Sequence, residues 1–230
     1  MKLLALDTAT ENISVAIYKD GEKFFKSNLA PQKHAELILP MIDDLLKEAL
    51  VDKNELDGIV LCVGPGSFTG VRVATSTAQG LALALDLKIA PVTSLEALAL
   101  EALSKKTDAP YVVSSIDARM NELYLAVYKN ENGNIRIIDS EVVLPYSECA
   151  QKLKDLGILL DSCAVAGTGI EYLKKEGLFN GVEPSVLYPN ARFILKEGKR
   201  KFESGDALDP SEALPLYVRN EVTWKKVSDQ

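Results

Sequence analysis

Alternating apolar and polar positions recur twice along the chain, about half its length apart. Residues 7–19 align without a gap with residues 117–129. Apolar positions match in the two copies: Ile13, Val15 and Ile17 fall on Leu123, Leu125 and Val127. Alternation of period two is typical of a strand with one buried face. Each copy therefore predicts a strand that ends at an aspartate, followed by a second strand that leads into a hairpin turn.

The similarity between the copies continues beyond the hairpins. The turns at 19–21 and 132–134 are each followed by a predicted third strand, over 22–27 and 135–143. Apolar runs at 57–64 and 161–167 then lead into glycine, each after a helical stretch. Two copies of strand, strand, strand, helix, strand, helix predict an α/β protein of two lobes, 1–107 and 108–230, with the boundary in the polar segment 104–110. The alternative is a chance match between two amphipathic hairpins.

Two predicted helices of the first lobe carry much apolar or small surface. Residues 32–50 have a wide apolar stripe that includes Leu37, Ile38, Met41, Ile42 and Leu45. Residues 71–85 place Ala74, Ala78 and Ala82 at intervals of four, and small side chains allow close helix approach. Both a subunit interface and internal packing are compatible with these patterns. A third helix is predicted after Thr93, which forms a capping box with Glu96.

The string 64–72, Gly-Pro-Gly-Ser-Phe-Thr-Gly-Val-Arg, is the most distinctive in the chain. A glycine-rich turn that enters a helix can present backbone amides to an anion. The string lacks the Lys-Ser/Thr ending of a Walker loop, and Pro65 breaks the pattern of a nucleophile elbow around Ser67. His34 is the one histidine, so neither a Ser-His-Asp triad nor a zinc site is expected. We predict no catalytic and no metal-binding residues, and a solvated or interface position for His34.

Composition narrows the classes of function. A net charge of −7 argues against a protein that grips nucleic acid unaided. The 3 cysteines lack metal-site spacing, which favours reduced thiols. No run approaches the ~20 apolar residues of a membrane span, so a cytoplasmic protein without a membrane partner is expected.

Five motifs together resemble the TsaB family, also called YeaZ. They lie in order along nearly the whole chain, at 3–10, 34–40, 64–72, 116–119 and 215–219. The resemblance implies a duplicated actin-like ATPase fold (ASKHA, RNase H-like), with a mixed sheet flanked by helices in each lobe. It also implies a paralogous partner, TsaD, and an ATPase, TsaE. Together these proteins install threonylcarbamoyl on the adenosine beside the anticodon of tRNAs that read ANN codons, with TsaD carrying the transfer chemistry.

Departures from active members of this fold suggest a subunit without catalysis. Active members usually have glycine two residues after the first aspartate, whereas this chain has Ala9, and residues 167–169 read Gly-Thr-Gly in place of paired glycines. The resemblance thus implies a scaffold that is an inactive paralogue of TsaD, and not an active M22 glycoprotease. It implies no cofactor of its own, with ATP used by partner subunits, tRNA bound only through the complex, and a homodimer when the protein is alone.

The partner interface is expected on the two first-lobe helices. Its predicted members are His34, Leu37, Ile38, Met41, Ile42, Leu45, Val71, Arg72, Ala74, Thr75, Ala78 and Ala82. A charge at Ala78 is expected to block assembly and leave the fold intact.

The alternative function is a small ATPase or kinase that acts on its own. Its anion or nucleotide contacts would be Asp7, Thr8, Ser67, Thr69, Asp117 and Arg119. For Arg119, a salt bridge to a nearby carboxylate is the other interpretation. The tail after Arg219, with Trp224, is compatible with packing against the body or with binding a partner.

Overall fold

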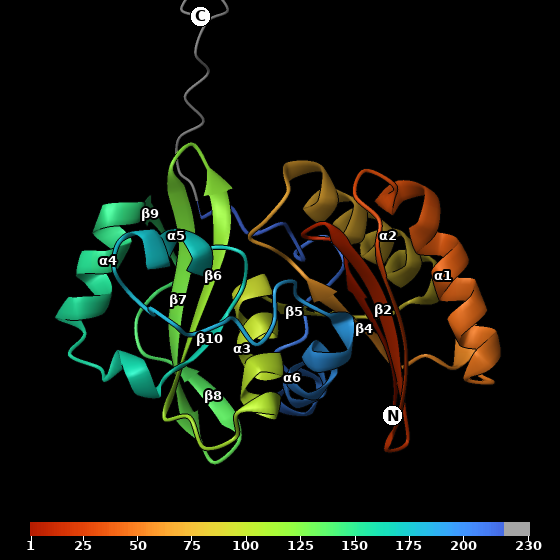
Figure 1. Ribbon diagram of the computed structural model, residues 1–230. Helices are drawn as coiled ribbons and strands as arrows, with labels where there is room; N and C mark the ends of the chain where they lie inside the picture. The colour runs from red at the N-terminus through yellow and green to blue at the C-terminus, as the bar shows by residue number, and fades with distance from the viewer. Residues whose placement is uncertain (219–230) are drawn as a thin grey trace, which may run out of the picture.

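Two five-stranded mixed sheets lie side by side in the computed structural model, which describes residues 1–218 (Figure 1). The predicted roles of the tail after Arg219 and of Trp224 therefore lie outside the described residues. The first sheet has the order β3-β2-β1-β4-β5. Its strands are β1 (Lys2–Asp7), β2 (Asn12–Lys19), β3 (Glu22–Leu29), β4 (Gly58–Cys62) and β5 (Ile89–Val92). β1 pairs antiparallel with β2 and parallel with β4, as the order of predicted elements requires.

The second sheet repeats this arrangement with β10-β6-β7-β8, and β9 also pairs with β7. Its strands are β6 (Tyr111–Arg119), β7 (Glu122–Glu131), β8 (Asn134–Ile137), β9 (Val142–Pro145) and β10 (Ala164–Ala166). The prediction of a single strand over 135–143 is wrong in one respect, because this segment forms two strands, β8 and β9. The split places the carboxylate of Glu141 against the hydroxyls of Thr93 and Tyr128.

The hairpin turns have the backbone that their sequences predict. Asp20 and Gly21 have φ of 49° and 106°, and Asn132 and Gly133 have φ of 58° and 84°. Positive φ at both central residues is the requirement of a two-residue hairpin turn that matches the strand twist. The Asp-Gly and Asn-Gly pairs thus fix the register of both hairpins.

Six α-helices and two short 3₁₀ helices connect the strands within the described residues. They are α1 (His34–Glu48), η1 (Lys53–Glu55), α2 (Phe68–Leu85), α3 (Ser94–Lys105), α4 (Tyr146–Asp155), η2 (Leu160–Ser162), α5 (Ile170–Lys175) and α6 (Ala191–Ser204). α2 begins three residues before the predicted start because the Ser67 side chain caps it, and the capping box of α3 is confirmed at Thr93 and Glu96.

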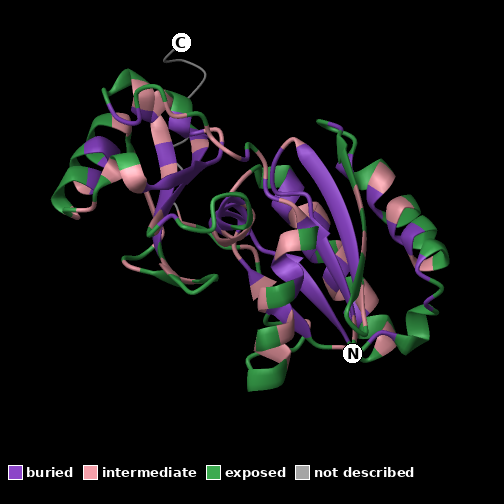
Figure 2. Ribbon diagram, turned by 60° about the horizontal axis from the view of Figure 1, so that its bottom comes forward, coloured by how far each residue is buried: buried purple, intermediate pink, exposed green. Residues whose placement is uncertain are grey.

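Helices cover both faces of each sheet. α1 and α2 cover one face of the first sheet, and α4 and α5 cover one face of the second (Figure 1). The remaining faces are covered by helices from the other half of the chain: α3 packs on the second sheet and α6 on the first. The division at 107/108 stays a prediction, and contacts cross it: α3 lies before it and α6 after it, but each packs on the sheet of the other half. Buried residues are concentrated in the strands between these helical layers (Figure 2).

Candidate functional site

The turn after β1, where an actin-like enzyme would meet phosphate, is closed. Asp7 and Thr8 have no exposed surface. Oδ1 of Asp7 accepts a hydrogen bond from the Ala9 amide at 2.9 Å, whereas Oδ2 is buried without a hydrogen-bond partner. Burial raises the pKa of Asp7 to about 6, although the Ala9 amide and the nearby Cys62 thiol act to lower it. The carboxylate is therefore desolvated and has no cation beside it among the described residues.

The Gly-rich segment 64–72 forms the lid over this turn. The Ser67 amide donates to the Ala9 carbonyl at 2.7 Å, and the Thr8 hydroxyl donates to the Gly70 carbonyl at 2.6 Å. A Cβ at Gly66 would lie 2.1 Å from the Ala9 oxygen. The glycine here serves close approach of two backbone segments. The Ser67 amide therefore already has a hydrogen-bond partner inside the protein and is not directed at a ligand.

The equivalent turn after β6 is built in the same way but is more open. The Arg119 amide donates to Oδ1 of Asp117 at 2.9 Å, as the Ala9 amide does to Asp7. Unlike Asp7, Asp117 has partners for its second oxygen: the Arg119 guanidinium at 3.1 Å and the Tyr172 hydroxyl at 3.2 Å. Arg119 thus forms a salt bridge to a nearby carboxylate, which was one of the two predictions for this residue.

Arg119 also joins the two copies of the repeat. Its guanidinium lies 3.7 Å from a carboxylate oxygen of Glu11, which follows the first aspartate turn. The side chain is 76% exposed, so this contact is weak by itself. It nevertheless shows that the two aspartate turns face each other between the lobes.

The Gly-Thr-Gly segment 167–169 also packs internally. The Gly169 amide donates to the Ser115 carbonyl at 2.9 Å, and a Cβ on Gly167 would lie 2.0 Å from the same oxygen. Thr168 accepts a hydrogen bond from the Asp117 amide at 3.2 Å. Both glycines therefore support the approach of α5 to β6.

His34 is buried, which corrects the solvated position expected for it. It is the first residue of α1, it is 8% exposed, and its Nε2 has no hydrogen-bond partner. Burial lowers the pKa of the ring. Within residues 1–218, no group of three His, Cys, Asp or Glu side chains is placed to hold a metal ion. The three cysteines are free and buried.

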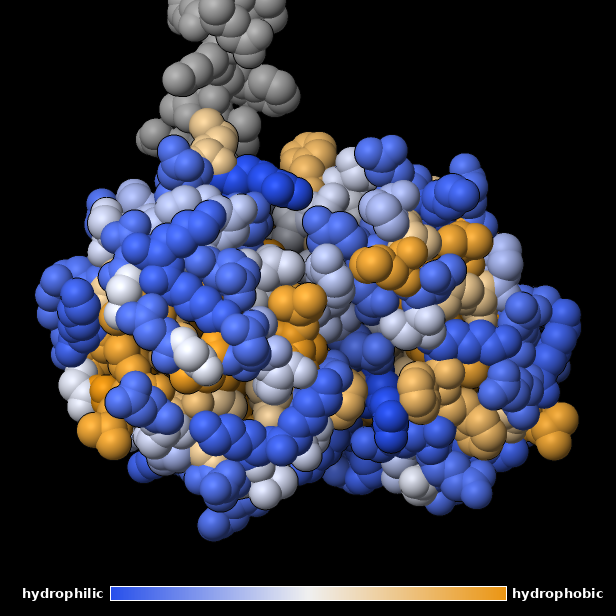
Figure 3. Space-filling model, viewed as in Figure 1, coloured by the Kyte–Doolittle hydropathy of each residue, from blue (hydrophilic) through white to orange (hydrophobic). Residues whose placement is uncertain are grey.

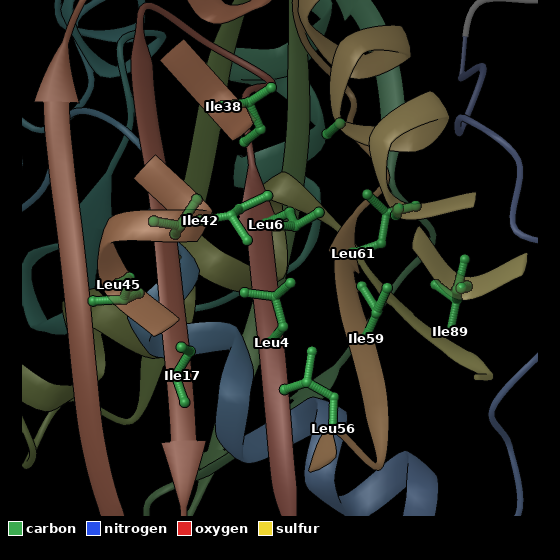
Figure 4. Packing of buried hydrophobic residues seen from close by; sticks show 14 of the residues in the cluster. Leu4, Leu6, Ile17, Ile38, Ile42, Leu45, Leu56, Ile59, Leu61 and Ile89 are labelled. Carbon is green, nitrogen blue, oxygen red and sulfur yellow. The ribbon is translucent and has the colours of Figure 1, made fainter. Parts of the chain in front are cut away.

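Most side chains predicted to form the partner interface lie in the core of the first lobe. Ile38, Ile42 and Leu45 of α1 contact the sheet residues Leu4, Leu6 and Ile17 (Figure 4). Five members on α2 are also buried: Val71, Ala74, Thr75, Ala78 and Ala82. Leu37, Met41 and Arg72 are partly exposed.

The expectation that a charge at Ala78 would leave the fold intact is consequently wrong. Ala78 is 0% exposed and packs inside the cluster that joins α1, α2 and the first sheet. A buried carboxylate there would lack any partner, so it would disrupt the fold before it reported on assembly.

The outward faces of α1 and α2 carry a different set of apolar side chains. Leu39 is 55% exposed, Phe68 68% and Leu83 79%. Figure 3 shows apolar patches within the hydrophilic surface of the lobe that carries these helices. Sequence reasoning missed these three residues, although a phenylalanine at the first position of a helix after a polar glycine-rich turn is a signal of exposure.

A groove of about 510 Å³ continues this surface along α2. It lies between α2 and segment 214–217, and Phe68, Arg72 and Gln79 form one wall. The Arg72 guanidinium lies 3.3 Å from the Phe68 ring centroid and 5.2 Å from that of Tyr217, to whose hydroxyl it also donates. Residues 215–218, from the last motif of the sequence, thus brace the start of α2.

Comparisons with known proteins agree with this arrangement. A protein-family model described as TsaD, tRNA N6-adenosine threonylcarbamoyltransferase, matches residues 26–189. The "tRNA threonylcarbamoyladenosine biosynthesis protein TsaB" of Haemophilus influenzae is 37% identical over 99% of this chain and 97% of its own length. The protein of the same name from Escherichia coli is 36% identical over 99% and 98%.

Solved structures give the same result for the fold. The structure of YeaZ from Pseudomonas aeruginosa superimposes with a TM-score of 0.82 at 34% identity and covers 94% of this chain and 100% of its own. The match confirms the duplicated actin-like fold with two mixed sheets. The chain belongs to the TsaB (YeaZ) family of TsaD-related proteins.

Proposed function

We propose that this protein is a non-catalytic subunit that pairs with a TsaD-type paralogue in the formation of threonylcarbamoyladenosine next to the anticodon of tRNA. The proposal is supported by the names of the relatives that match nearly the whole chain, and by the match to a TsaD model. A TsaE-type ATPase would complete the assembly, and tRNA modification would take place in the cytoplasm. No helix among the described residues is both long and apolar enough to cross a bilayer.

One observation carries the non-catalytic part of the proposal: Asp7 and Thr8 are buried beneath the segment 64–72. A phosphate would have to displace the Ser67–Ala9 and Thr8–Gly70 hydrogen bonds before it reached the carboxylate. Opening this packing also exposes the buried side of the turn, so nucleotide binding would begin with a loss of stability.

The outward faces of α1 and α2 are the surface that we assign to the TsaD-type partner. Leu39 on α1, and Phe68 and Leu83 on the adjacent α2, are exposed apolar side chains, and clusters of such side chains mark protein–protein contacts. The same face would allow self-association of the isolated subunit, because a duplicated ancestor leaves homologous faces on both partners.

Light scattering of this protein alone and with the TsaD-type protein of its own host tests the proposal. We expect a mixed complex to replace the self-associated form. Leu83→Glu should weaken the mixed complex at least ~10-fold, because it places an unpaired charge in the apolar contact. Leu159→Glu is the matched control, since Leu159 is 73% exposed but belongs to the second lobe. Equal complex formation by both variants would remove this surface from the proposal.

Calorimetric titration with Mg-ATP separates the subunit from the rival ATPase or kinase. We expect no tight binding by the isolated protein. Micromolar binding that is lost in Asp7→Ala would establish the rival function instead. The same titration on the mixed complex then asks whether nucleotide binds only after assembly.

A further inference from the structure

Three basic side chains form a cluster on the surface where α6 crosses the first sheet. Lys23 comes from β3, and Arg192 and Lys196 come from the first turns of α6; all three are exposed. We call them the Lys23 cluster. Arg192 and Lys196 are four residues apart on one face of α6, and the Arg192 guanidinium lies over the ring of Phe25, which is two residues from Lys23 on the same side of β3. In agreement with this placement, the charges of Arg192 and Lys196 act to lower the pKa of Lys23, in addition to the larger effect of partial desolvation.

The cluster has no compensating carboxylate. No Asp or Glu oxygen of residues 1–218 lies within ion-pair distance, 4.0 Å, of its three side chains. Two other cations of α6 are paired with carboxylates, Lys199 with Glu203 and Arg200 with Glu197 at 2.6 Å, whereas Lys201 donates to the Pro91 carbonyl. In a chain of 33 acidic and 26 basic residues, three adjacent cations without a carboxylate leave a local positive surface that suits an anion supplied from outside.

Two of the three side chains are held in place for such a ligand. The Arg192 guanidinium stacks over the Phe25 ring at 4.3 Å, and no side-chain hydrogen bond from it is made within the described residues. Stacking of this kind leaves the N–H edge of the guanidinium available for a phosphate. The Lys196 ammonium is anchored by the Gly133 carbonyl at 3.2 Å and by Oδ1 of Asn134 at 2.9 Å.

We infer that the Lys23 cluster contacts the phosphate backbone of tRNA, an inference that rests on the proposed function. The cations stand on two separate elements on an exposed surface, which suits an extended polyanion better than a small anion in a pocket. The net charge of −7 is consistent with this role, because three contacts add to those of an assembly and do not hold RNA alone. The tRNA path therefore runs over α6 and β3 of this subunit.

A triple variant tests the assignment: Lys23→Gln, Arg192→Gln and Lys196→Gln. The matched control is Lys53→Gln, Lys154→Gln and Lys175→Gln, which removes the same charge from exposed lysines elsewhere. tRNA binding by the mixed complex with the TsaD-type protein is measured by fluorescence anisotropy over a range of salt concentration. Each lost phosphate contact lowers the slope of log affinity against log salt by about 0.7 to 0.9, so the test variant should lose about 2 to 3 in slope.

Two readouts keep the inference separate from the proposed function. Complex formation is first measured by light scattering for all three proteins. If even the unsubstituted chain forms no complex, the proposed function fails, and the inference that rests on it fails with it. A test variant that binds tRNA like the control overturns the inference. So does a test variant that loses the TsaD-type protein but keeps tRNA binding, because the cluster would then recognise an acidic protein.

Discussion

Replacing Asp7 by asparagine should stabilise the protein more at high pH than at low pH. Asp7 is fully buried, Oδ2 has no hydrogen-bond partner, and the pKa is raised from 3.8 to about 6. A group whose pKa is higher in the folded state binds its proton more tightly there. Its favourable contribution is complete below the unfolded pKa and is lost as the pH rises through the folded pKa. Ionised Asp7 consequently destabilises the native protein.

The size of the effect follows from the two pKa values. At 1.36 kcal/mol per pH unit, the rise from 3.8 to about 6 makes the ionised carboxylate cost about 3 kcal/mol above pH 7. About 1.4 kcal/mol of that cost develops between pH 5 and pH 8. The asparagine side chain does not titrate, so the difference in unfolding free energy between variant and wild type should grow by this amount.

Urea unfolding of both proteins at several pH values between 5 and 8 is the assay. The growing difference should move the variant's midpoint, relative to wild type, by about 0.5 M. Any constant offset, such as imperfect packing of the amide, cancels from the comparison. A difference that stays constant from pH 5 to pH 8 would refute the reasoning, because it would mean that the carboxylate is solvated.

Asp117→Asn is the control for this prediction. Asp117 makes the same turn in the second copy, but its Oδ2 accepts from Arg119 and Tyr172. At Asp117 the substitution removes a carboxylate that is ion-paired, whereas at Asp7 it removes one that has no partner for Oδ2. It should therefore bring no gain in stability at high pH.

Three further predictions concern packing and are all measured by urea unfolding at pH 7. Ala78→Asp should destabilise the protein by at least about 3 kcal/mol, because an unpaired charge enters the core; a cost below 1 kcal/mol would contradict the burial of this site. Gly70→Ala should cost about 2 kcal/mol since its Cβ would lie 2.1 Å from a backbone oxygen, whereas Gly80→Ala in the same helix meets open space and should stabilise by up to about 1 kcal/mol. Tyr128→Phe removes a 2.8 Å hydrogen bond to the half-buried Glu141 and should cost about 1 to 2 kcal/mol; an unchanged midpoint would show that water replaces the hydroxyl.

The strands and turns could be predicted because their signals are local. Alternation of period two located β2 and β7, and the Asp-Gly and Asn-Gly pairs fixed the hairpins that follow them. The break between β8 and β9 depends on Glu141 reaching Thr93 about fifty residues away, and local sequence contains no trace of such a contact.

The orientation of the first-lobe helices could not be predicted from their pattern. α2 is apolar or small on nearly every side, so hydrophobicity does not tell which side faces the sheet. The alanine stripe turned inward because small side chains let the helix approach the strands closely, and Leu83 was left outside. The burial of His34 could not be predicted either, because a polar residue at the start of a helix is ordinarily exposed.

Because α3 packs on the second sheet and α6 on the first, the two copies of the repeat cannot be separated into independent domains. Cutting the chain near residue 107 would strip the second sheet of α3 and leave the first sheet with one bare face. Neither fragment would be a soluble domain, and each would expose the apolar side of a strand layer. The two helices also pack against each other, so contacts between α3 and α6 hold the two lobes together. Any opening or closing of the two lobes would therefore have to bend or separate these two helices.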